Sequence, residues 1–143
     1  SVNVGTRLPA HATVLGRVLM ADMSLEQLRE LYPEGVLPTV NAFTPRTVEQ
    51  LYALLQRDRE RPYLLHEGFF ESGISTLAAP VRQEGGAIAA ALGVAMPAVP
   101  IEASILERLA RAVCESAAEL SALLNYRGPV AYGLHEKLNG MVA

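Results

Sequence analysis

Few side chains in this sequence have the types and spacing that support chemistry. The three histidines, His11, His66 and His135, stand far apart and form no HxxxH or HExxH pattern, which argues against a metal site. Cys114 is the only cysteine, so the chain has neither an internal disulfide nor a zinc site built from cysteines. We expect His11 to cap or pack against a helix and Cys114 to be buried in the core.

The sequence also lacks the arrangement that activates a nucleophile. Residues 73–77 contain a serine but lack the second glycine of the G-x-S-x-G elbow, and they precede a strand instead of joining a strand to a helix. No GxGxxG or Walker pattern occurs, so we expect no cofactor. An enzyme would have to use His66 with Glu67 or Glu71, and these glutamates fit a solvated loop as well. The sequence therefore predicts a protein that is not an enzyme.

The composition is that of one globular domain. The chain has 143 residues, of which half are hydrophobic and 19% are charged, and its net charge is −3. The run 57–61 alternates in sign, as solvated helix faces do, so this chain by itself is not expected to bind nucleic acid. The single cysteine, the lack of a signal peptide and the lack of a long apolar run predict a cytoplasmic protein with no membrane contact.

Hydrophobic periodicity and capping signals predict four helices, at about residues 12–23, 24–31, 44–60 and 101–125. Gly16 is costly inside a helix, so it indicates that something packs close to that backbone. Ser24 and Gln27 form a capping box, and Thr44 with Pro45 is typical of a helix start. The apolar stripe of the last helix is expected to comprise Ile105, Leu109, Ala112, Val113, Leu120, Leu123 and Leu124.

Three strands are expected at about residues 63–66, 74–82 and 87–96, with a glycine hairpin turn over 83–86. The third strand is almost wholly apolar, which predicts a place inside the sheet with both faces covered. Its small residues, Gly93 among them, let a helix pack closely or leave room for a ligand. Residues 1–4 alternate like a strand already under way, so we interpret the chain as a fragment of a longer protein. The order of elements predicts an α+β fold with a mainly antiparallel sheet.

Three segments carry a longer pattern. Residues 5–21 read GTRLPAHATVLGRVLMA, residues 73–81 read GISTLAAPV, and residues 86–94 form the end of a glycine hairpin and a strand of small residues. Together with the long C-terminal helix, they closely resemble the effector-binding domain of the IclR family of bacterial transcription regulators. The resemblance covers about residues 2–125, and the first motif is the most specific.

The resemblance implies a GAF-like domain over residues 1–126, with a curved sheet and flanking helices, followed by a C-terminal tail over 127–143. It implies a homodimer or homotetramer that binds a small organic acid effector. It also implies that DNA is bound only through an N-terminal winged helix-turn-helix domain, which is absent from this chain. Effector binding would then change the affinity of the oligomer for its operator.

Positions that would contact the effector are carried over through the motifs. They are Val14, Leu15, His66, Ile74, Thr76, Gly93 and Ala95. The residue types fit a mostly apolar pocket with few polar anchors, and backbone N–H groups at the start of the first helix would favour an anionic head group.

The chain departs from many relatives inside this pocket. Relatives often carry an acidic residue near position 66, Glu at 69, Cys or Ser at 76, and Ser near 93 and 95. The residues here are His66, Phe69, Thr76, Gly93 and Ala95. We therefore expect a more apolar pocket with a titratable imidazole, unsuited to small keto acids. Residues 2–9 are most similar to the regulators of protocatechuate and 4-hydroxybenzoate breakdown, which favours an aromatic or similarly apolar carboxylate.

Two other interpretations stay open. The domain could be an oligomerisation module whose cavity is filled by its own side chains, although the small residues at 93 and 95 argue against this. It could also be an enzyme that uses the same cavity.

Overall fold

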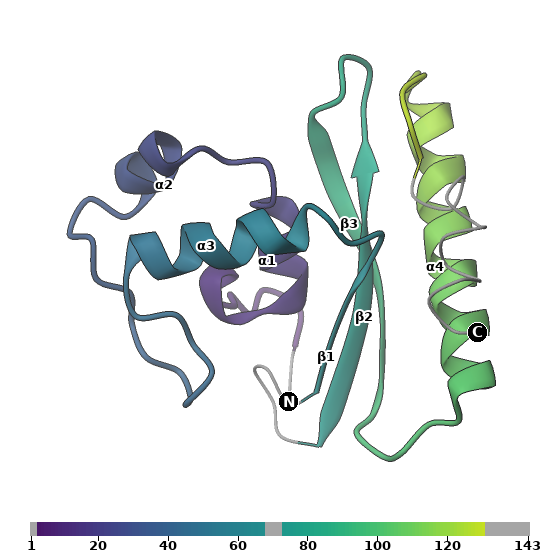
Figure 1. Ribbon diagram of the computed structural model, residues 1–143, viewed down its shortest axis with the longest axis horizontal. Coiled ribbons are helices and arrows are strands. Elements are labelled where there is room, and N and C mark those ends of the chain that lie inside the picture. Colours follow the sequence, from purple (N-terminus) through teal and green to yellow (C-terminus); the bar gives the residue numbers. More distant parts are fainter. Residues whose placement is uncertain (1–2, 68–72, 131–143) are drawn as a thin grey trace.

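The computed structural model describes residues 3–67 and 73–130, and its sheet stands between two helical layers (Figure 1). Helices α1 to α3 lie on one side of the sheet, and α4 runs along the other side. The fold is therefore α+β, as expected. The elements are η1 (Ala10–Ala12), α1 (Val14–Leu19), α2 (Leu25–Leu31), α3 (Val48–Asp58), β1 (Leu64–Glu67), β2 (Ile74–Arg82), β3 (Ile88–Pro97) and α4 (Ala103–Leu123).

The sheet is antiparallel, with strand order β1-β2-β3. The β2–β3 hairpin turns through Gly85 and Gly86, whose φ angles of 88° and 98° favour glycine. Successive residues of β2 face opposite sides of the sheet. Leu77 packs in the core with α4, whereas Ala78 packs in the core with α1. The side of the sheet that faces α1 is therefore lined by the even-numbered residues of β2.

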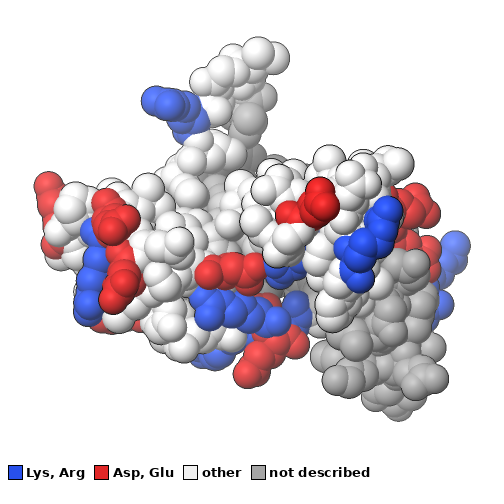
Figure 2. Space-filling view, turned by 90° about the horizontal axis from the view of Figure 1, so that it is seen from above, with Lys and Arg blue, Asp and Glu red and all other residues white. Residues whose placement is uncertain are grey.

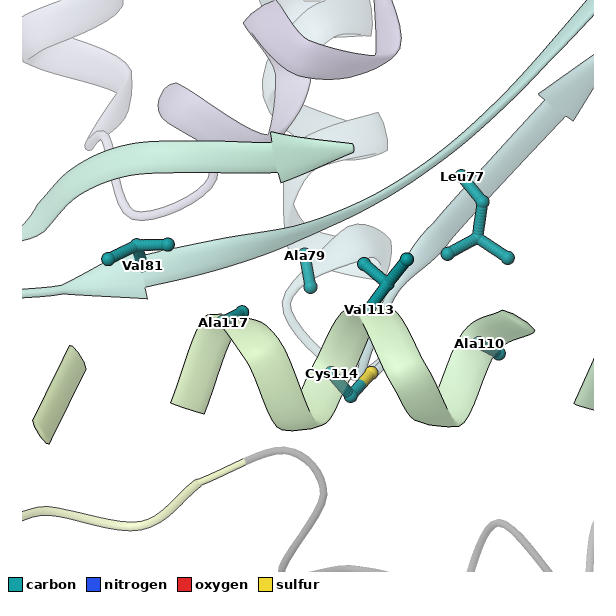
Figure 3. Close-up of a cluster of buried hydrophobic side chains, with 7 residues drawn as sticks. All are labelled: Leu77, Ala79, Val81, Ala110, Val113, Cys114 and Ala117. Carbon is teal, nitrogen blue, oxygen red and sulfur yellow. The ribbon is translucent and has the colours of Figure 1, made fainter. Parts of the chain in front are cut away.

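Side chains of β2 and α4 meet in one buried cluster (Figure 3). Leu77 and Val81 supply bulk from the strand, while the helix contributes mainly small residues. The apolar stripe predicted for this helix was mostly wrong: Val113 is buried and Leu109 half-buried, but Ile105 is 46% and Leu123 78% exposed. Large strand residues facing the helix leave room only for small ones on it. The helix residues of the cluster are Ala110, Val113, Cys114 and Ala117.

Several element boundaries differ from the sequence prediction. The expected 12–23 helix is divided at Thr13, whose backbone is extended and whose hydroxyl caps α1 by accepting from Gly16 N at 3.1 Å. The third helix begins later than predicted, after the N-cap Thr47, because Thr44 is used in a turn instead. The capping box of Ser24 is confirmed.

The sequence predicted a strand over residues 1–4, and this was wrong for residues 3 and 4, which the structure describes. Asn3 begins a turn closed by a 3.0 Å bond from Thr6 N to Asn3 O, and residues 1–2 lie outside the described ranges. The tail is described only to Val130, with Tyr126 Oη donating to Pro129 O at 2.6 Å. His135 lies outside the described residues.

The prediction that the third strand lies inside the sheet with both faces covered was also wrong. It is an edge of the sheet that residues 3–67 and 73–130 form, and much of it is exposed. The strand with the most buried residues is β2, which has neighbours on both edges and helices on both sides. A run of small apolar residues has the same appearance whether it is central or at an edge, so the sequence did not separate the two.

Charged residues of both signs are interspersed on the face seen in Figure 2, with no large basic patch in that view. The alternating run 57–61, predicted to be a solvated helix face, is partly buried. Asp58 is 6% exposed, and Arg59 donates to the backbone carbonyls of Ala21 and Met23. These charges therefore tie the end of α3 to the segment after α1. Within the described ranges, no helix is long and apolar enough to cross a membrane.

Candidate functional site

Helix α1 lies on the side of the sheet where the predicted effector contacts are found, and its position is fixed by a close backbone contact. A Cβ placed on Gly16 would lie 2.1 Å from Ala10 O and 2.5 Å from Ala10 Cα. Only glycine allows η1 and α1 to approach so closely. This confirms the prediction that something packs against the backbone at Gly16.

A buried ion pair holds the same helix from the other side. Arg17 donates from Nε and Nη2 to the two carboxylate oxygens of Asp58, at 2.9 and 2.6 Å. Asp58 is the last residue of α3, where the helix dipole opposes a negative charge, and its side chain is 4% exposed. The two charge-assisted hydrogen bonds from the guanidinium therefore offset the cost of burying a carboxylate at this helix end.

The strand register brings together most of the predicted site residues. His66 pairs with Thr76, and Thr76 pairs with Ala95, so the three lie side by side across the sheet. Their row is one step from Ala78, which packs in the same core as Val14, so it faces α1. The structure thus gathers an imidazole, a hydroxyl and a methyl on the face that α1 covers.

Two further predicted residues touch at the next row. A Cβ placed on Gly93 would lie 3.0 Å from Leu15 Cδ2 and 3.1 Å from Ala78 Cβ. Gly93 therefore lets α1 lie close to β3, with Leu15 reaching over the strand. Val14 is 3% exposed and packs within the core, while Ile74 pairs with Pro97 at the far end of the hairpin. These two are walls of the region and not its centre.

Sequence reasoning missed Phe43. Its ring packs edge-to-face on His66, with 5.8 Å between centroids and an interplanar angle of 63°. The residue lies in a loop without periodicity, and no motif marks it. An aromatic residue in a turn beside Asn41 and Thr44 is the only available signal, and it is a weak one.

His11 and Cys114 have structural roles, as predicted. His11 is buried, its Nε2 lies 2.7 Å from Pro38 O, and its ring packs edge-to-face on Tyr32. Burial, with a smaller effect from the charge of Glu115, raises the pKa of the Cys114 thiol to about 11. At neutral pH this thiol is protonated and a poor nucleophile.

The expected anion site at the start of the first helix stays a prediction. Helix α1 has six residues, and its Gly16 N–H is already bonded to the Thr13 hydroxyl. The polar groups in the described part of the row are therefore His66 and Thr76. Phe69 and Glu71 lie outside the described residues, and so does the side chain of Glu67. Within residues 3–67 and 73–130, no three His, Cys, Asp or Glu side chains gather as metal ligands would.

Two cavities flank the central strand. One of about 40 Å³ lies among α1, the end of α3 and β2, and it is large enough for water only. The other, of about 210 Å³, lies on the opposite side of the sheet, where β2 faces α4. Cys114, Ala117 and Ser121 line it from the helix. This second cavity is large enough for a small molecule and is therefore a competing location for one.

The fold and the sequence motifs agree with one family of known proteins. A family profile described as "Bacterial transcriptional regulator IclR C-terminal" matches residues 1–122. The chain belongs to the IclR family. Among curated IclR-type relatives, the Pca regulon regulatory protein of Pseudomonas putida is 32% identical over 107 residues, covering 75% of this chain and 37% of the relative. The regulator XynR of Escherichia coli K12 is 32% identical over 126 residues, covering 86% and 49%.

Solved IclR structures share the fold. The inducer-binding domain of PobR from Acinetobacter, a double mutant in complex with 3-hydroxybenzoic acid, has a TM-score of 0.71 and 26% identity over 83% of this chain and 69% of that one. An IclR homologue from Microbacterium hydrocarbonoxydans, in complex with 4-hydroxybenzoate, has a TM-score of 0.69 and 29% identity over 86% and 49%. The chain spans less than half the length of the two curated relatives, so it corresponds to their C-terminal part.

Proposed function

We propose that this IclR domain binds a small aromatic or similarly apolar carboxylate on the α1 side of the sheet, over the row of His66, Thr76 and Ala95, and not in the cavity of about 40 Å³ among α1, α3 and β2. The observation that carries the proposal is the row of His66, Thr76 and Ala95 on the face that α1 covers. An imidazole and a hydroxyl among small neighbours give an apolar ligand two polar anchors. The proposed contact set is Val14, Leu15, His66, Ile74, Thr76, Gly93 and Ala95.

The ligand class is supported by chemistry and by relatives. With Gly93 and Ala95 on β3, most of the surface facing α1 is apolar, which favours a ligand with an apolar body over a short keto acid. Two solved relatives hold hydroxybenzoates, which are aromatic carboxylates. We extend this class to the present chain.

The proposed role is sensing rather than catalysis. The relatives are named as transcriptional regulators, which supports a regulatory role for this domain and not a catalytic one. We propose that residues 1–126 are the effector-binding unit of a longer cytoplasmic regulator, that 127–143 form its tail, and that a preceding winged helix-turn-helix domain binds DNA. In a homodimer or homotetramer, the ligand changes operator affinity only through its different affinity for two arrangements of the subunits.

A thermal unfolding titration with aromatic and short aliphatic carboxylates tests the proposal. A ligand that binds only the folded state stabilises it, by about 2.7 kcal/mol at a hundred times its dissociation constant. A raised midpoint with aromatic acids is expected. Shifts with short keto acids alone would refute the ligand class, and no shift with any acid would favour an oligomerisation module. Turnover of a bound acid would instead indicate an enzyme.

A further inference from the structure

Phe43 is a large aromatic side chain that remains 66% exposed although it lies against the candidate site. Its ring centroid is 5.8 Å from that of His66. His66 is paired across the strands with Thr76, so Phe43 stands at one end of the proposed ligand row. None of the positions carried over from the family lies in this loop.

The turn that carries Phe43 is rigidly bonded. Thr44 is 5% exposed, and its Oγ1 accepts from Asn41 N at 3.0 Å and from Val40 N at 3.3 Å. The Asn41 side-chain oxygen accepts from Phe43 N at 2.9 Å. These bonds restrain the backbone of the turn, and the ring contact places Phe43 beside His66. Because the backbone of the turn is already bonded, its ordering adds little to the conformational entropy lost on ligand binding.

We infer that Phe43 and His66 form an aromatic wall that selects a flat aromatic carboxylate over a saturated carboxylate of similar size. The inference rests on the proposed function and adds a specificity-determining residue to it. Aromatic rings prefer offset or edge-to-face partners, and a benzoate ring provides such a partner while a cyclohexane ring does not. Phe43 supplies an exposed ring surface at the position where this contact forms.

Calorimetric titration of the protein with benzoate and with cyclohexanecarboxylate tests this wall. The wild-type protein is expected to prefer benzoate. Phe43→Leu keeps apolar volume but removes the ring, so its dissociation constant for benzoate should rise about threefold to tenfold, as expected for one aromatic pair. Its affinity for cyclohexanecarboxylate should not change, and Phe43→Tyr should behave as wild type. Leu123→Ala is the control, because Leu123 is 78% exposed on α4, on the other side of the sheet.

The outcomes separate the inference from the proposed function. If Phe43→Leu lost affinity for both acids equally, the inference would be overturned and Phe43 would contribute only apolar contact area. Unchanged benzoate affinity would overturn it as well, with effector binding intact. A wild-type protein that binds neither acid would refute the proposed function and the wall together. The unliganded melting midpoint of Phe43→Leu should match wild type, since the side chain is mostly exposed.

Discussion

Replacement of Gly16 by alanine tests whether α1 is seated as the structure has it. Alanine is favoured over glycine inside a helix by about 1 kcal/mol, so helix propensity alone predicts stabilisation. The structure predicts the opposite, because the new Cβ would lie 2.1, 2.5 and 2.6 Å from the O, Cα and C atoms of Ala10. These are backbone atoms, so relief requires η1 to move by roughly 1 Å. Overpacking of this kind costs about 1–3 kcal/mol or somewhat more.

We expect Gly16→Ala to be about 2 kcal/mol less stable than wild type, once the propensity gain is subtracted from a cost near the upper end. For a chain of this size, that lowers the melting midpoint by roughly 4–8 °C. Urea denaturation and calorimetry measure both quantities. The matched control is Gly93→Ala, whose new Cβ would lie 3.0 Å from the flexible end of Leu15 and 3.1 Å from Ala78 Cβ and Leu77 O, so these neighbours need to shift by only a few tenths of an ångström. That variant should lose less than about 1 kcal/mol. A Gly16→Ala protein as stable as wild type would refute the close seating of α1 on η1.

Three further predictions concern the ion pair, the buried thiol and the ligand face. Arg17→Ala should lower the free energy of unfolding by about 3–5 kcal/mol in urea denaturation, because it leaves the buried Asp58 carboxylate without its partner. The double variant with Asp58→Ala should recover part of this loss. Purely additive losses would mean that the pair is not coupled. The raised pKa of Cys114 means that the unfolded thiol, with its ordinary value of 9.0, loses its proton before the folded one does. Stability should therefore fall as pH rises from about 9 to about 11, and less steeply in Cys114→Ala; equal slopes in the two proteins would contradict this. Gly93→Phe should abolish the thermal shift by aromatic acids while light scattering shows an unchanged oligomer, and a normal shift would place the ligand elsewhere.

Local chemistry made part of the fold predictable. The capping box of Ser24, the glycine hairpin and the close approach at Gly16 are each settled by a few neighbouring residues. The bounds of β2 were predicted as 74–82 and are found there. The α+β class followed from the order of such elements.

Properties that depend on distant partners were not predictable. Nothing beside Asp58 in sequence indicates that Arg17, on another helix, buries it. The buried face of α4 is decided by bulky Leu77 and Val81 on β2, so the large residues of the helix were placed on the wrong side. Phe43 became part of the candidate site only because the chain folds back over β1.

A crystal structure of the protein with 4-hydroxybenzoate tests the central claim most directly. We expect the ligand on the α1 side of the sheet, within contact of His66, Thr76 and Ala95, with its ring near Phe43. Ligand in the cavity of about 210 Å³ between β2 and α4, beside Cys114, would contradict the proposed site. A protein that leaves the α1 side empty at saturating ligand would contradict it as well.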